Sequence, residues 1–144
     1  MGILKESITV LRNALLSNSK VQNLCGDRVK PLIMPHQERD EDGNLNDVGA
    51  FIVIAREDFH EEQNQFDTYN ETCDMVANAV SVDYDESLEL AEAILLEIKK
   101  LRNVQHYQIF ATSSSEEVLG YEEEGQTRYV QIIKYSFGAL RCNN

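Results

Sequence analysis

The chain has 144 residues, 42% of them hydrophobic and 26% charged, which predicts one globular domain over 1–144 rather than a disordered chain. No apolar run approaches the roughly 20 residues of a membrane span, and three scattered cysteines do not suit a disulfide framework. The formal charge is −12, and the segments 37–48, 57–71 and 113–126 hold 16 of the 25 acidic residues but one of the 13 basic ones. This distribution argues against a protein that grips nucleic acid through its phosphates.

Two helices are predicted at the start of the chain. Apolar residues spaced by four, three and four predict an amphipathic helix over 4–16. Ser19 followed by Gln22 has the pattern of a capping box, which predicts a second, short helix. Gly26 can take the left-handed conformation that ends this helix.

Strand segments are predicted next along the chain. Residues 28–34 form a short extended run, whose first proline confines it to a sheet edge or a bulge. The continuous β-branched run 50–55 predicts a buried central strand, and 72–83 predicts another strand. The polar segments between them, 37–48 and 57–71, are predicted to be long acidic loops.

A long helix follows these strands. Asp83 and Asp85 both offer an N-cap to a helix that continues through Arg102 with a wide apolar face. Its acidic residues come early and its basic residues late, which matches the helix dipole.

The end of the chain predicts two further strands, 104–112 and 127–137, joined by a long loop over 113–126, with 137–144 expected to be a frayed tail. The predicted fold class is therefore α+β. We expect a mainly antiparallel sheet of about four to five strands, packed on one face by the long helix and the N-terminal helix.

No metal or cofactor site is predicted. The acidic run 40–44 is not an EF-hand loop, because Leu45 and Phe51 stand where that loop needs glycine and glutamate. The three cysteines have no metal-ligand spacing, and Cys73, in a strand, is expected to be a small core residue.

No enzyme is predicted either. His36, His60 and His106 could each supply a general base, and the serines 113–115 a nucleophile, but nothing in the sequence ties any two of them together.

The acidic segments are the remaining candidates for function. Surface solvation explains acidic residues in any loop, but loops of about 12–15 residues are unusually long for a compact domain and tend to be functional. Aromatic residues within them indicate segments that order against a partner. The candidate partner-facing or pore-facing residues are Glu61, Glu62, Phe66, Tyr69, Glu116, Glu117, Tyr121, Glu122, Glu123 and Glu124.

Four short motifs resemble phage tail-completion proteins, the tail-terminator group of long-tailed phages. They are Leu24–Pro31 after the opening helix, Phe51–Ile54 after a variable loop, Val80–Ala91 where a strand runs straight into the long helix, and Tyr129–Tyr135 as the closing strand. The sequence departs from the family pattern in lacking the proline that often opens the second strand, and in its long acidic segments.

The resemblance implies a structural virion protein that assembles in the host cytoplasm as a ring of its own copies, usually a hexamer. Such a ring sits on the head-proximal end of the tail tube, stops the tube protein from polymerising and joins the neck or connector proteins. DNA would pass through without specific binding, and no membrane is involved. Acidic side chains around the pore would repel the DNA backbone in transit.

Two other classes remain open. One is a neck or adaptor ring nearer the portal, which the same fold could serve. The other is an acidic inhibitor that mimics DNA, and this class ranks lower because a mimic needs its charges on one rigid face, whereas these charges are expected in loops.

Overall fold

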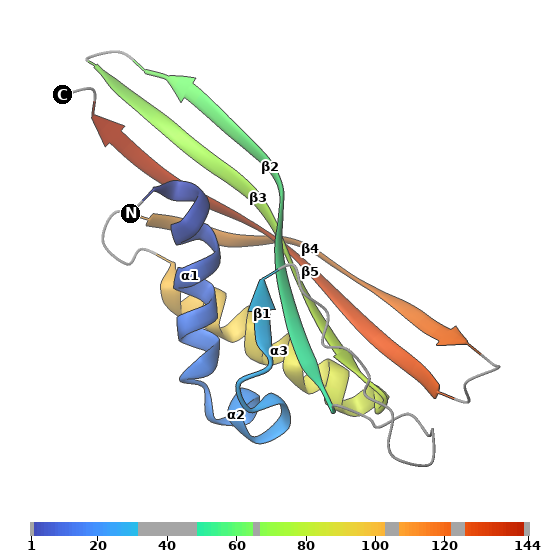
Figure 1. Cartoon of the computed structure of the whole chain (residues 1–144). Coiled ribbons are helices and arrows are strands. Elements are labelled where there is room, and N and C mark those ends of the chain that lie inside the picture. The colour runs from blue at the N-terminus through green and yellow to red at the C-terminus, as the bar shows by residue number, and fades with distance from the viewer. Residues whose placement is uncertain (1, 32–48, 65–66, 103–106, 122–125, 143–144) are drawn as a thin grey trace, which may run out of the picture.

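The computed structural model describes residues 2–31, 49–64, 67–102, 107–121 and 126–142. They form three helices and a five-stranded sheet (Figure 1). The elements are α1 (Ile3–Leu16), α2 (Ser19–Cys25), β1 (Val29–Pro31), β2 (Phe51–Gln63), β3 (Thr68–Ser81), α3 (Tyr84–Leu101), β4 (Tyr107–Tyr121) and β5 (Gln126–Cys142). The predicted α+β class is confirmed.

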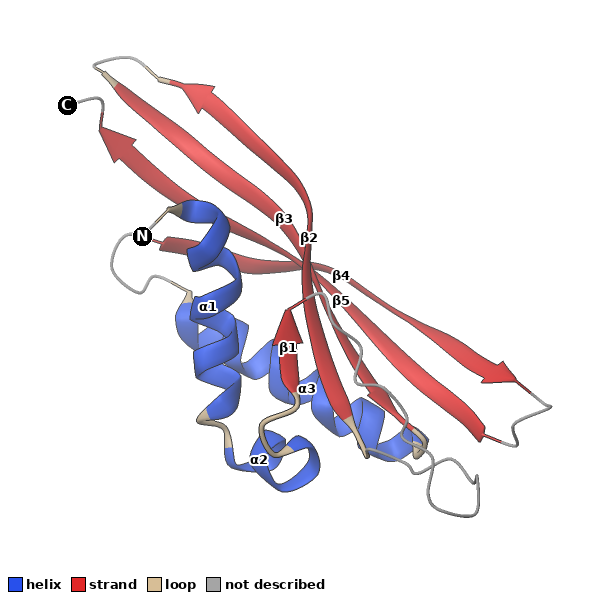
Figure 2. Cartoon of the chain, in the orientation of Figure 1, coloured by secondary structure: helices blue, strands red, loops and turns tan. Residues whose placement is uncertain are grey.

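The strands follow the order β1-β2-β3-β5-β4 across the sheet. β1 pairs in parallel with β2, and the other three pairs of neighbours are antiparallel. β1 lies at an edge, as its proline predicts, because Pro31 has no amide to donate to a further strand. All three helices lie on one face of the sheet (Figure 2).

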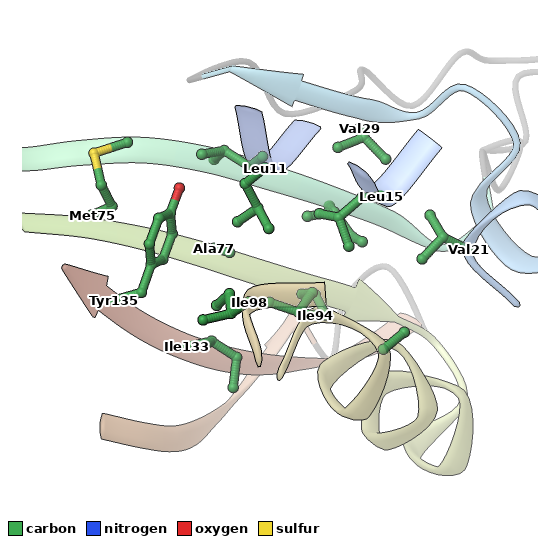
Figure 3. Packing of buried hydrophobic residues seen from close by; sticks show 14 of the residues in the cluster. Leu11, Leu15, Val21, Val29, Met75, Ala77, Ile94, Ile98, Ile133 and Tyr135 are labelled. Carbon is green, nitrogen blue, oxygen red and sulfur yellow. The ribbon is translucent and has the colours of Figure 1, made fainter. Parts of the chain in front are cut away.

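The main hydrophobic core lies between the helices and this face of the sheet. Residues from the helices and from β1, β3 and β5 meet there (Figure 3): Leu11, Leu15, Val21, Val29, Met75, Ala77, Ile94, Ile98, Ile133 and Tyr135. The Tyr135 hydroxyl is buried and donates a hydrogen bond to the carbonyl oxygen of Ser7 at 3.2 Å. A smaller buried cluster, built on Phe51, Val53, Val80 and Val130, forms where alternate residues point to the opposite face.

Asn18, not Ser19, is the N-cap of α2. Its side-chain oxygen accepts hydrogen bonds from the amides of Lys20 at 2.9 Å and Val21 at 3.1 Å. Asparagine caps helices as well as serine does, so the predicted N-cap was one residue late, and Val21 rather than Gln22 stands three residues after the cap. Gly26 ends the helix, as predicted, with a positive φ of 59°, but its ψ of −123° differs from the left-handed helical conformation that the sequence predicted.

The predicted N-cap of α3 is confirmed at Asp83, whose carboxylate accepts from the amide of Glu86 at 3.1 Å. Acidic residues in the first turn and Lys99 and Lys100 in the last complement the helix dipole. None of the described helices is long and apolar enough to cross a membrane.

Two of the predicted loops are wrong. Most of 57–71 belongs to β2 and β3, which pair from Phe51↔Val80 to Gln63↔Tyr69, and most of 113–126 belongs to β4 and β5. The side chains of 56–63 and 110–119 are exposed, so neither stretch has a buried face to give the apolar alternation of an ordinary strand.

The predicted frayed tail is also wrong as far as the structure describes it. β5 continues to the pair Thr68↔Cys142, and Gly138 and Ala139 pair with both β3 and β4. The acidic segment 37–48 lies outside the described residues.

Candidate assembly surfaces

Two long hairpins extend from the helix-covered body in opposite directions (Figure 1). One is formed by the outer parts of β2 and β3, and we call it the β2–β3 arm (56–63 with 68–75). The other is formed by the outer parts of β4 and β5, and we call it the β4–β5 arm (113–121 with 126–134). Both arms carry acidic residues that the sequence singled out.

The β4–β5 arm presents apolar side chains on both of its faces. Val118 pairs with Tyr129 and is 62% exposed, and Leu119, which alternation directs to the opposite face, is 42% exposed. Glu116 and Glu117 precede them and are likewise exposed on alternate faces. A strand that exposes apolar residues on both faces, at the edge of a sheet, has the features of a protein-binding surface.

The start of α3 fixes one side of this arm. The Tyr84 hydroxyl donates a hydrogen bond to Glu116 Oε1 at 3.1 Å, and its ring meets the Tyr129 ring edge-on with centroids 5.3 Å apart. The carboxylate of Glu116 raises the pKa of Tyr84 above its usual value. Farther along, Gln131 Nε2 donates to Ser87 Oγ at 3.3 Å. The arm is therefore held at a defined angle to the body.

The β2–β3 arm places like charges directly across from one another. Asp58 pairs with Asp74, and Glu61 pairs with Glu71, which is unfavourable for paired strands. His60 relieves the first pair, because its Nε2 lies 2.9 Å from Asp74 Oδ2 and 3.5 Å from Asp58 Oδ2. The hydrogen bond to Asp74, with the charge of Asp58, raises the pKa of His60 above its ordinary value.

His60, Asp58 and Asp74 also form a group of ligand atoms that all lie within 4.8 Å of one another, close enough to share a cation. The sequence prediction treated His60 as isolated, and it missed this cluster. Asp58 and His60 are two residues apart and therefore point to the same face of a strand. This spacing indicates that the two side chains lie close together only when 57–63 is recognised as a strand. All three side chains are at least half exposed, and an ion pair accounts for their arrangement.

Arg141 joins the outer part of the β2–β3 arm to the body. Its Nη2 lies 3.0 Å from Glu6 Oε1 in α1, and its Nε donates to Glu71 Oε1 at 2.9 Å. Burial raises the pKa of Glu6, but hydrogen bonds from Tyr107 and Arg141 outweigh it, so the pKa stays below its usual value. The C-terminal end of β5 is therefore tied to both a helix and a strand.

The structure divides the predicted site residues between the two arms. Glu61, Glu62 and Tyr69 lie on the β2–β3 arm, and Glu116, Glu117 and Tyr121 lie in β4. Phe66, Glu122, Glu123 and Glu124 lie outside the described residues. The sequence prediction missed Val118 and Tyr129 on the β4–β5 arm, and Tyr84 at the start of α3.

Cys25 and Cys73 do not add a reactive group to either arm. Cys25 and Cys73 are free and buried, which confirms the expectation that Cys73 is a core residue. Burial raises the pKa of the Cys25 thiol to about 12, so it stays protonated at neutral pH.

No protein-family model matches this chain, and no curated protein sequence matches it. Among solved structures, it is similar to a chain in a structure described as "Virion of native gene transfer agent (GTA) particle", with a TM-score of 0.68. The two sequences are 10% identical, and the match covers 96% of this chain and 99% of the other. At this identity the likeness establishes a shared fold over nearly the whole length of both chains.

Proposed function

We propose that this chain is a structural protein of a virion, and specifically a tail terminator. In this role it forms a ring on the head-proximal end of the tail tube, stops the tube protein from polymerising and offers the surface that joins the neck or connector proteins. The observation that carries the proposal is the fold shared over 96% of the chain with a component of a gene transfer agent virion. The four motifs that resemble tail-completion proteins point in the same direction.

A ring of identical copies suits a chain with two different projecting arms. A head-to-tail contact joins one surface of each copy to a different surface of the next, and repetition closes the ring when the rotation permits. The copies would number six if the family resemblance extends to the assembly. No catalytic step is part of the proposed role.

The acidic arms supply the proposed contacts with the tube, the neck or the pore. Glu61, Glu62 and Tyr69 on the β2–β3 arm, and Glu116 and Glu117 on the β4–β5 arm, project from the helix-covered body. Carboxylates that face a pore would repel the phosphates of passing DNA and keep it from adhering. Phe66, Tyr121 and Glu122–Glu124 are included in the same proposed surfaces on the sequence prediction alone.

A neck or adaptor ring is the second candidate, because the same fold and the same arms would serve it. The order of assembly separates the two roles, since a terminator binds a finished tube before the head arrives. An acidic DNA mimic has less support. A DNA mimic needs its charges together on one face of the molecule. Side chains along a strand alternate between the two faces of the sheet, so neighbouring acidic residues such as Glu61 and Glu62 point in opposite directions.

The first experiment is native mass measurement with negative-stain imaging of the purified chain, alone and with tail tubes from the phage or prophage that encodes it. A ring with an open centre, or a cap on one end of each tube, is the expected result. A monomer that ignores tube ends would overturn the proposal.

A second experiment tests the acidic surface. Changing Glu122, Glu123 and Glu124 to glutamine should slow DNA passage or impair head joining and lower the phage titre without unfolding the protein. The control removes charges from exposed positions outside the acidic segments, by Asp27→Asn with Asp85→Asn. An unchanged titre for the first variant, or an equal loss for both, would reject the acidic-surface hypothesis.

A further inference from the structure

In addition to the β4–β5 arm, which is acidic and apolar, the molecule has a second exposed surface, which combines apolar residues with positive charge. It is the C-terminal half of the outer side of α3, where Leu95 is 36% and Leu96 48% exposed. Lys99, Lys100 and Arg102 follow, all exposed. We call these five residues the α3 basic surface.

A groove of about 500 Å³ borders the α3 basic surface, between α3 and the start of α2. Leu96 and Ala93 form its apolar part, Lys20 and Lys100 contribute positive charge, and Glu89 and Glu92 line it toward the start of α3. In its wall Glu97 is already paired, since its Oε1 accepts from Asn18 Nδ2 at 2.9 Å and lies 3.4 Å from Lys100 Nζ.

The two surfaces complement each other in chemistry. Glu116 and Glu117 are followed by exposed Val118 and Leu119, and the α3 basic surface places exposed leucines before its cations. Apolar contact at the centre with opposite charges around it is the usual anatomy of a protein interface. Like charges on the two surfaces would instead oppose such a contact.

One chain cannot bring the two surfaces together. The β4–β5 arm is anchored at the first residue of α3 by the bond between Tyr84 and Glu116, and it points away from the helix (Figure 1). The basic surface lies at the other end of α3, and an 18-residue helix is roughly 27 Å long. The two surfaces can therefore contact each other only when they belong to two different molecules.

We propose that the β4–β5 arm of one copy docks on the α3 basic surface of the next copy, with Leu119 against Leu95 and Leu96, and with Glu117, on the same face of the strand as Leu119, near the cations. The contact joins two different surfaces, so each copy gives an arm and receives one, and the contact repeats in a ring. This inference rests on the proposed ring and names the contact that builds it. It assigns Glu117 to the neighbouring copy rather than to the pore.

The test uses two variants that each lose one of the two surfaces. The arm variant carries Glu117→Lys, which leaves the bond between Tyr84 and Glu116 intact. The helix variant carries Lys99→Glu and Arg102→Glu, which leaves the pair between Lys100 and Glu97 intact. Each reversal turns attraction into repulsion and should weaken self-association at least about tenfold. Each variant alone should be monomeric by analytical ultracentrifugation and native mass measurement.

Mixing the two variants is the decisive step. The helix variant keeps its arm and the arm variant keeps its α3 basic surface, and the two reversed surfaces also attract each other, so an equimolar mixture should assemble with the two variants alternating. A chain with all three substitutions should assemble again, because the charges of both surfaces are reversed. The matched control, Glu62→Lys on the β2–β3 arm, changes the charge as much as the arm variant does and should assemble like the unmodified chain.

The outcomes separate this contact from the proposed function. Rings that form and cap tubes equally well in both variants would overturn the contact and leave the terminator role standing. Assembly of the mixture, with no binding of the unmodified chain to tube ends, would support the contact and overturn the terminator role. A mixture that stays monomeric, or a triple variant that does not reassemble, rejects the contact.

Discussion

The two halves of β2 lie in one continuous strand but in opposite environments. Phe51–Ile54 are buried, packed beneath the helices on one face and within the smaller cluster on the other. Beyond a register shift between Arg56 and Asp58, residues 58–63 are exposed and mostly polar. The inner half is held by burial, whereas the outer half depends on backbone pairing with β3 and on a few polar contacts. A protein that extends such a strand past its own core has a surface suited to a partner.

The largest expected effect comes from a matched pair of phenylalanines. Phe137 and Phe59 flank the same residue, Cys73, in neighbouring strands, but Phe137 is 0% and Phe59 is 37% exposed. Phe137→Ala should lower the free energy of unfolding by about 3–5 kcal/mol, because it empties a packed site beside Tyr107. Phe59→Ala should cost less than about 1 kcal/mol. Urea denaturation measures both, and equal losses would contradict the division into core and arm.

The second effect concerns the joint between arm and body. Glu6→Ala removes the buried carboxylate that holds Arg141 and should lower the free energy of unfolding by about 2 kcal/mol. Faster amide exchange at the C-terminal end of β5 should accompany the loss, because Arg141 then keeps only Glu71.

The control for this joint is Glu61→Ala. Glu61 is exposed and lies across from Glu71, so its removal should be neutral or slightly stabilising. A cost equal to that of Glu6→Ala would show that the arm is held by its whole charge pattern rather than by the joint.

The sequence predicted the parts of the fold that have a buried face. The spacing of apolar residues identified α1 and α3, and Asp83 and Gly26 mark helix ends by local chemistry that needs no tertiary context. The buried run at Phe51–Ile54 was equally plain. In each case burial imposes a pattern that survives in the sequence.

The arms could not be predicted in the same way. Residues 113–119 in β4 pair regularly with β5, but both of their faces meet solvent, so serines and glutamates serve as well as apolar residues. The side-chain contacts of the β2–β3 arm could not be predicted for a different reason. Arg141 and Glu6 are 135 residues apart in the sequence, and Asp74 and His60 are 14 residues apart. Such pairs depend on the strand register, which short polar segments do not specify.

The smallest expected effect, and the one most specific to the β2–β3 arm, is the pH dependence supplied by His60. Its hydrogen bond to Asp74 and the charge of Asp58 raise its pKa in the folded chain above the ordinary 6.5. A raised pKa means that the folded state binds the proton more tightly than the unfolded state. The contribution to stability is therefore fully present below pH 6.5 and is lost as the pH rises through the folded pKa.

His60→Gln should abolish this contribution, so the difference in unfolding free energy between the two proteins should shrink as the pH rises from 6 toward and past the folded pKa. NMR titration of the His60 ring gives that pKa directly, and Asp74→Asn should return it toward 6.5 because the first cause of the shift is then gone. Histidines 36 and 106 are present in every variant, so their titration cancels in the comparison. An unshifted His60, or a stability difference that does not change with pH, would mean that Asp58 and Asp74 repel each other without relief and that backbone pairing alone keeps the arm in register.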